Sequence, residues 1–154
     1  WQDTHPRYAT VVHELKSGFS VELPAGWPAP DEELSLIEIG SLPDRRALDQ
    51  LRWNISIHDY GVNGQVEAVI AEIRSDGPGG VKIKDVILTN GVVAKTWIDV
   101  QALVERSQEN RIYVFKAPNG HVYSVLEPMA RDWRTQARYG NIFRAILGSM
   151  KFKP

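Results

Sequence analysis

The chain has 154 residues, a formal net charge of −1 and no cysteine. Hydrophobic residues make up 43% of it and charged residues 24%, values typical of globular domains that argue against disorder, collagen and coiled coil. A basic excess, the usual mark of nucleic-acid binding, is missing, and the lack of cysteine excludes disulfides, iron–sulfur clusters and thiolate chemistry.

The N-terminal residues predict an irregular segment over 1–7, followed by a single domain over 8–154. Because the sequence starts at Trp1 rather than Met, we expect that an upstream segment has been removed, such as a leader or a segment with a lipid-bearing cysteine. No apolar run approaches the roughly 18 residues of a transmembrane helix. We therefore expect no transmembrane segment.

The first half of the domain predicts strands. Residues 8–15 and 19–23 flank the turn at 16–18 and predict a hairpin with one buried face. Prolines around Trp27 end this hairpin, and the carboxylate run 31–33 predicts a solvated loop. A third strand is expected over 34–42.

The middle of the chain continues this pattern with one helix. Residues 51–58 alternate strictly between apolar and polar and predict a strand. Val66, Val69, Ile70 and Ile73 recur at helical spacing, which predicts an amphipathic helix over 63–75.

The second half predicts a meander and a closing helix. Asn90-Gly91 and Pro118-Asn119-Gly120 predict hairpin turns. The expected strands are 82–89, 92–104, 111–117 and 121–127, with a bulge or bend inside the long second one. The helix over 132–147 is predicted to turn Trp133, Ala137, Gly140, Phe143 and Leu147 toward the sheet.

These elements predict the α+β class, because strands in a run with only two helices do not suit a parallel βαβ fold. We expect one antiparallel sheet, containing 19–24 and the strands from 51 onward, with helices against its faces. Four aromatic side chains are expected in the core: Trp27, Trp53, Phe143 and Phe152.

His58-Asp59 is an adjacent histidine–carboxylate pair at the end of a predicted strand. It could ligate a metal or act as a base. One pair cannot complete a site, and an exposed strand end is the alternative interpretation. No zinc-protease, phosphate-loop, dinucleotide or nucleophile-elbow motif is present, so we predict no enzymatic activity and no cofactor.

The segment 131–139 has the most unusual local composition. Arg131, Arg134 and Arg138 are spaced by three and four residues, which places them on one helical face. Tryptophan, tyrosine and arginine dominate protein interfaces. The three arginines therefore predict a partner-binding strip, and a solvated helix face is the alternative.

Two segments resemble PsbP-like domains. Residues 17–27, with the sequence Ser-Gly-Phe-Ser-Val-Glu-Leu-Pro-Ala-Gly-Trp, resemble their opening hairpin, and residues 142–152 resemble their closing helix with its Ser-x-Lys-Phe ending. The resemblance spans about Tyr8 to Phe152. It implies an α/β/α sandwich around an antiparallel sheet.

The members of this superfamily include a photosystem II extrinsic subunit, a Ran-GTPase nucleotide-release factor, secretion effector chaperones and exported bacterial lipoproteins. The resemblance implies binding to other proteins rather than a reaction. We therefore expect a non-catalytic, protein-binding bacterial domain that is exported to the periplasm or the cell exterior, with a lipid anchor on the removed N-terminal segment as one alternative. The alternative is a small-molecule or metal-binding domain that uses a cleft between sheet and helix.

Overall fold

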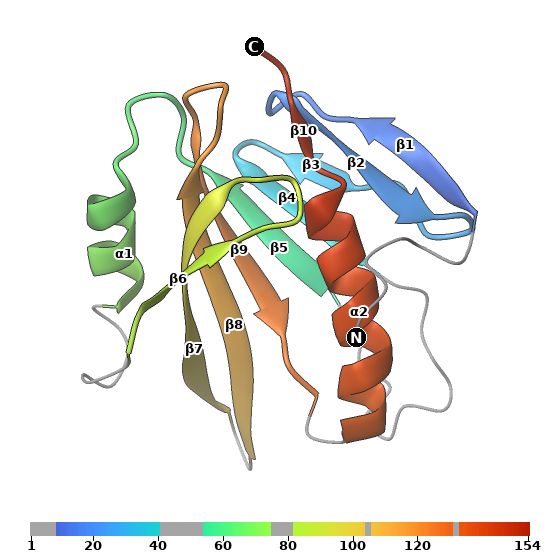
Figure 1. Cartoon of the computed structure of the whole chain (residues 1–154). Helices are drawn as coiled ribbons and strands as arrows, with labels where there is room; N and C mark the ends of the chain where they lie inside the picture. Colours follow the sequence, from blue (N-terminus) through green and yellow to red (C-terminus); the bar gives the residue numbers. More distant parts are fainter. Residues whose placement is uncertain (1–8, 41–53, 75–81, 104–105, 131–132) are drawn as a thin grey trace.

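A computed structural model describes residues 9–40, 54–74, 82–103, 106–130 and 133–154. Within these residues the chain forms two antiparallel sheets and two helices, α1 (Val66–Arg74) and α2 (Trp133–Gly148) (Figure 1). The expected lead-in 1–7 and the first part of the strand 51–58 lie outside the described residues.

The larger sheet has seven strands, and every neighbouring pair is antiparallel. In spatial order they are β3 (Asp31–Glu33), β4 (Leu36–Gly40), β5 (Asn54–Asp59), β9 (Val122–Pro128), β8 (Arg106–Lys116), β7 (Val93–Leu103) and β6 (Lys84–Ile87). The smaller sheet contains β1 (Thr10–Glu14), β2 (Phe19–Pro24) and β10 (Lys151–Phe152). The predicted α+β class is therefore confirmed.

Both faces of the central strands are buried. Successive side chains of a strand point to opposite faces, so Tyr113 and Phe115 of β8 join the core beneath α2 and β2, whereas Ile112 and Val114 pack with α1. Figure 1 shows α1 on one side of the large sheet and α2 on the other. The arrangement is an α/β/α sandwich, as the resemblance implied.

The prediction of one sheet containing 19–24 is wrong. The strand β2 lies between β1 and β10, with Phe152 opposite Phe19 in the register. Phe19, Val21 and Leu23 are fully buried against the core that α2 also covers. Alternation indicates which side of a strand is buried, but it does not indicate which strand lies beside it.

Residues 31–40 also differ from the expectation. The chain reverses at Leu34, whose φ of 55° lies in the left-handed region and whose side chain is 97% exposed. The expected loop 31–33 is the strand β3, and the expected strand over 34–42 is β4, with Ile37 and Ile39 in the core. A reversal at a leucine has no sequence signal, because non-glycine residues rarely adopt positive φ.

The carboxylate of Glu32 is not simply solvated. It accepts hydrogen bonds from the backbone N–H groups of Lys16 and Ser17, both at 2.9 Å, and from the Ser17 hydroxyl at 3.0 Å. Glu32 therefore ties β3 to the β1–β2 turn.

The long strand β7 contains no bulge where its pairing is described. Its register with β8 runs unbroken from Lys95 opposite Val114 to Leu103 opposite Arg106. The expected bulge is therefore wrong in this part of the strand. Near the β6 end of this pair, residues on its two faces join two different buried clusters, one with α2 and one with α1.

The four expected core aromatics have different outcomes. Phe143 is buried, as predicted, while Trp27 and Phe152 are only partly buried against the same core. Trp53 lies outside the described residues.

The expected inward side of α2 is wrong for its first turns. Trp133 is 74% exposed and Ala137 is also exposed, whereas Gly140, Phe143 and Leu147 are buried or partly packed as predicted. The buried positions of this helix begin only at Tyr139. Trp133 and Ala137 continue the apolar spacing toward the N-terminus of α2, but both side chains are exposed.

Candidate functional site

The structure separates the side chains of His58 and Asp59. They are neighbours on β5, so they point to opposite faces of the sheet. His58 Nε2 lies 3.2 Å from the Ser35 hydroxyl, and its ring stacks on Tyr60 at 4.4 Å between centroids. The described residues contain no group of three side chains arranged to hold a metal ion.

Asp59 has a different histidine partner, which sequence reasoning missed. Its two carboxylate oxygens lie 3.0 and 3.2 Å from Nδ1 of His121, 62 positions along the chain. Asp59 Oδ1 also accepts the backbone N–H of Gly61 at 2.8 Å. Pairing of β5 with β9 brings the two residues together, and nothing in the local sequence predicts that pairing.

The surroundings of this pair are those of a structural contact. The His121 ring stacks on Tyr123 at 5.8 Å. The Tyr123 hydroxyl donates to the backbone carbonyl of Ser17 at 2.6 Å, and burial raises the pKa of this phenol to about 12. The contacts among Asp59, His121 and Tyr123 therefore connect the turn after β8 to the turn after β1.

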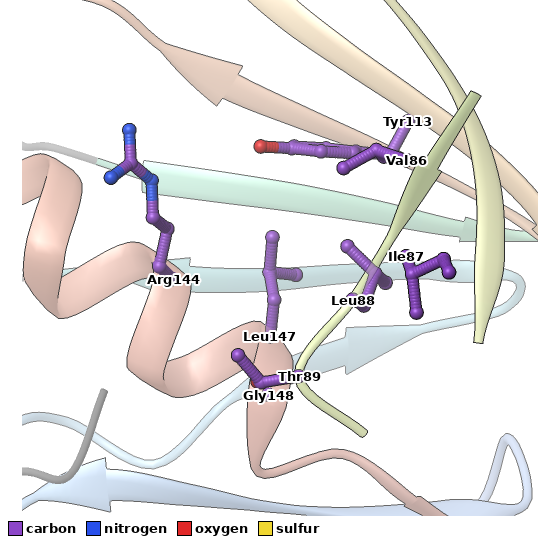
Figure 2. Close-up of a pocket in the computed structure, with 8 residues that line it drawn as sticks. All are labelled: Val86, Ile87, Leu88, Thr89, Tyr113, Arg144, Leu147 and Gly148. Atoms are coloured by element: carbon purple, nitrogen blue, oxygen red, sulfur yellow. The ribbon is translucent and has the colours of Figure 1, made fainter. Parts of the chain in front are cut away.

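A pocket lies between the edge strand β6, the strand β8 and the second half of α2. Its volume is about 130 Å³. Figure 2 shows the side chains around it, which are mostly aliphatic: Val86, Ile87, Leu88, Thr89, Tyr113, Arg144, Leu147 and Gly148.

One end of this pocket is closed by a tight approach of two turns. A side-chain carbon at Gly148 would overlap the side chain of Thr89. Next to it, Asn90 Nδ2 donates to the carbonyl oxygens of Leu147 at 3.3 Å and Met150 at 3.2 Å. The β6–β7 turn is thus tied to the end of α2, which fixes the two walls of the pocket.

A buried polar group lies beyond the other end. The Tyr113 hydroxyl donates to Glu127 Oε2 at 3.2 Å, and Glu127 is only 3% exposed. Burial raises the pKa of the Tyr113 phenol and the pKa of the Glu127 carboxyl group. The positive charges of Arg111 and Arg144 act in the opposite direction and lower both pKa values. Burial is therefore the largest influence on both groups.

A second hollow, of about 470 Å³, lies along the other edge of the large sheet. Three carboxylates line it, from Asp31, Glu33 and Glu38, together with Asn54. Asn54 Oδ1 is buried and has no hydrogen-bond partner among the described residues. Gly40 and Asn54, which both line the hollow, are the last and first described residues on either side of the undescribed positions 41–53.

The predicted partner-binding arginines are only partly described. Arg131 lies outside the described residues, and Arg134 and Arg138 are exposed on α2. The Arg134 guanidinium lies 5.4 Å from the centroid of the Trp133 ring, and that of Arg138 lies 5.6 Å from the centroid of Tyr139. Sequence reasoning identified the arginines here but not the exposure of the tryptophan beside them.

Two solved structures share this architecture. One is a protein of unknown function from Pseudomonas aeruginosa, PA94, described as a candidate regulator, with a TM-score of 0.58 and 12% identity over 94% of this chain and 98% of that chain. The other is cyanobacterial PsbP (CyanoP) from Synechocystis sp. PCC 6803, with a TM-score of 0.57 and 13% identity over 96% of this chain and 94% of that chain. No family model and no curated protein matches the sequence.

The chain therefore has a PsbP-like fold, as the resemblance of residues 17–27 and 142–152 predicted. At this level of identity the likeness establishes the fold alone. In the described residues, no helix is long and apolar enough to cross a membrane.

Proposed function

We propose that this protein is a non-catalytic interaction domain that docks on a protein partner through the exposed start of α2. The docking surface consists of Trp133, Arg134 and Arg138, and we include Arg131 from its place in the sequence. The observation that carries the proposal is the 74% exposure of Trp133 on a helix whose second half is in the core. Exposed tryptophan beside arginine is typical of the residues that dominate binding energy at interfaces.

The charge of this surface favours an acidic partner. The first turn of α2 contains no acidic residue, and the N-terminal end of a helix already has a partial positive charge. The aromatic rings hold both described guanidinium groups within cation–π distance. A partner segment with carboxylates around an apolar side chain matches this surface in charge and in apolar area.

The PsbP-like fold supports a binding role, because the known members of that superfamily share binding to other proteins. We extend the proposal to location and expect the protein outside the cytoplasm, with or without a lipid anchor. Mass spectrometry of the native N-terminus tests this part. An N-terminus that begins at a cytoplasmic initiator methionine would contradict it.

The docking surface can be tested with displayed peptides. A library of acidic peptides with one central aromatic residue is selected against the purified chain, and the best binders are measured by fluorescence anisotropy. Trp133→Ala should weaken binding about tenfold or more, as for an interface hot spot. Arg134→Glu with Arg138→Glu should slow association and weaken its dependence on salt.

A matched control keeps this test specific. Lys84→Glu with Lys151→Glu makes the same charge change on β6 and β10, and both lysines are exposed. Binders that respond equally to the two pairs of substitutions recognise net charge, which would contradict docking at α2. Selection of no acidic peptide that depends on Trp133 would also contradict it.

A further inference from the structure

The strand β6 is one edge of the seven-stranded sheet, and only β7 pairs with it. The backbone N–H of Leu88, just after β6, donates to the carbonyl oxygen of Val92 at 2.8 Å. Antiparallel strands alternate between hydrogen-bonded and non-hydrogen-bonded pairs, so Asp85 and Ile87 occupy non-hydrogen-bonded positions. Their backbone N–H and C=O groups therefore point away from β7, and no backbone group elsewhere in the described residues bonds to them.

Apolar side chains lie on both faces of this free edge. On one face, Ile87 is 72% exposed and lies opposite Val93, which is 59% exposed. On the other face, Val86 and Leu88 line the pocket beside α2, and Figure 2 shows them on the same side of β6 as Leu147. A strand added at this edge would make apolar contacts on both faces, because its side chains alternate in the same way.

The pocket has room for one side chain. Its volume of about 130 Å³ is close to that of an engineered apolar cavity of about 150 Å³ that binds benzene. Its closed end lies where Thr89 meets Gly148. A leucine side chain or a phenyl ring therefore fits the space.

We infer that β6 binds an extended segment of a partner protein, which adds an antiparallel strand to the edge and places one leucine-sized side chain in the pocket. The antiparallel direction follows that of every other pair in the sheet. The partner residue opposite Val86 enters the pocket, and the residue opposite Ile87 packs on Ile87 and Val93. In this mode of recognition, main-chain hydrogen bonds supply affinity and the side-chain pocket supplies specificity.

A second copy of this chain fits the edge less well. Pairing requires the outward-pointing residues of the two strands to face each other. The two registers that align most of β6 with its copy place Asp85 opposite either the second Asp85 or the second Ile87. Like charges directly opposite each other are destabilising, and a carboxylate opposite Ile87 loses the apolar contact.

The probe is a blocked hexapeptide, Thr-Val-Leu-Thr-Glu-Thr. Paired antiparallel with β6, its valine lies opposite Ile87, its leucine opposite Val86 and its glutamate opposite Lys84. A flexible peptide loses conformational freedom on binding, so we expect a Kd of about 0.2 mM and titrate to about 2 mM.

Binding is followed by nuclear magnetic resonance of the isotope-labelled full chain. We expect saturable shifts of the Asp85 and Ile87 amide groups and of the Leu88 and Leu147 methyl groups. Amide hydrogen exchange at Asp85 and Ile87 should slow when the peptide is bound, because both N–H groups gain an acceptor.

Three altered peptides separate strand pairing from filling of the pocket. Replacement of the leucine by alanine should weaken binding at least about tenfold, because apolar contact in the pocket is lost. N-methylation of the valine removes an N–H that faces the edge and should also weaken binding at least about tenfold. N-methylation of the leucine is the matched control, because that N–H points away from β6, and it should change the Kd by less than about twofold.

Variants of the chain test the same contacts from the other side. Asp85→Pro removes an outward N–H that takes no part in pairing with β7, a position that tolerates proline, and should weaken binding at least about tenfold. Asp85→Ala is its control, since it loses the same 2.7 Å ion pair with Lys95 but keeps the N–H.

Val86→Trp tests the pocket, because it fills the space from the edge strand. It should remove the preference for the leucine peptide over the alanine peptide. Val12→Trp, at a 56% exposed position on β1, adds the same bulk elsewhere and should keep that preference. Circular dichroism confirms that each variant is folded.

Four outcomes overturn the inference. The wild-type chain gives no saturable shifts, or the leucine and alanine peptides bind equally. Equal binding of the two N-methylated peptides, or of Asp85→Pro and Asp85→Ala, would mean that the pocket takes a side chain without strand pairing. Sedimentation that shows a dimer of the free chain, abolished by Asp85→Pro, would assign the edge to a second copy.

These outcomes are independent of the acidic-peptide experiment. The docking surface begins at Trp133, whereas the pocket lies beside Leu147 near the other end of α2. Failure of either proposal therefore leaves the other standing.

Discussion

The two halves of α2 differ in burial and in the residues that they expose. The second half contributes Phe143, Ile146 and Leu147 to the core, and the β6–β7 turn is hydrogen-bonded to its end. The first half presents Trp133 and two arginines to solvent. The second half of the helix therefore contributes to the core, whereas the first half is the part on which the docking proposal rests.

The largest expected effect is at the buried end. Phe143→Ala removes a fully buried ring and leaves a cavity, so it should reduce the free energy of unfolding by about 3–5 kcal/mol. Urea denaturation measures the change. Asn141→Ala, at an exposed position two residues earlier, should change stability by less than about 0.5 kcal/mol, and similar losses in both variants would refute the contrast.

The hydrogen bonds from Asn90 should have the next largest effect. Asn90→Asp keeps the side-chain oxygen that accepts the backbone N–H of Val92, but it replaces both bonds to α2 with a carboxylate facing two carbonyl oxygens. We expect a loss of about 2–3 kcal/mol, since two acceptors lose their donor. Asn141→Asp is the control for added charge, and an Asn90→Asp variant as stable as that control would show that the tether contributes nothing.

Removal of the Tyr113 hydroxyl should cost less. Tyr113→Phe leaves the buried carboxyl group of Glu127 without this donor, which should lower stability by about 1–2 kcal/mol. A double-mutant cycle with Glu127→Leu separates the hydrogen bond from the loss of the hydroxyl itself. Additive effects in that cycle would mean that the two side chains are not coupled.

A smaller effect should appear as a dependence of stability on pH. Burial raises the pKa of Glu127 above its ordinary value of 4.5, so the folded state binds a proton more tightly than the unfolded state does. Its contribution to stability is therefore greatest below about pH 4.5 and decreases as the pH rises through the folded-state pKa. Denaturation at several pH values should show a flatter profile in Glu127→Gln, and identical profiles would contradict the raised pKa.

The smallest effect on stability is expected at the exposed end. Trp133→Ala should change the free energy of unfolding by less than about 0.5 kcal/mol, as for most surface substitutions, although the same change should weaken binding of acidic peptides. A thermal melt of the variant provides the measurement. A loss of more than about 2 kcal/mol would place Trp133 in the core and would remove the basis of the docking proposal.

The sequence predicted the functional candidates unevenly. The spacing of Arg134 and Arg138 was enough to place them on one side of a helix, because helical geometry repeats every 3.6 residues. The exposure of Trp133 was not predictable in the same way. The apolar spacing of a helix shows which side faces the core, but it does not show how far along the helix the core extends. The pocket depends on Val86, Tyr113 and Arg144, which come from three separate elements.

The local pattern of the sequence by itself determined most strands, both helices, their order and the α+β class. These features follow from alternation, helical spacing and turn residues, all of which act over a few positions. Only the tertiary structure decided that β2 lies in a second sheet with β10, that Asp59 pairs with His121, and that one end of α2 is exposed. Each of these depends on strand pairing or packing between distant segments, and side-chain periodicity does not specify which segments meet.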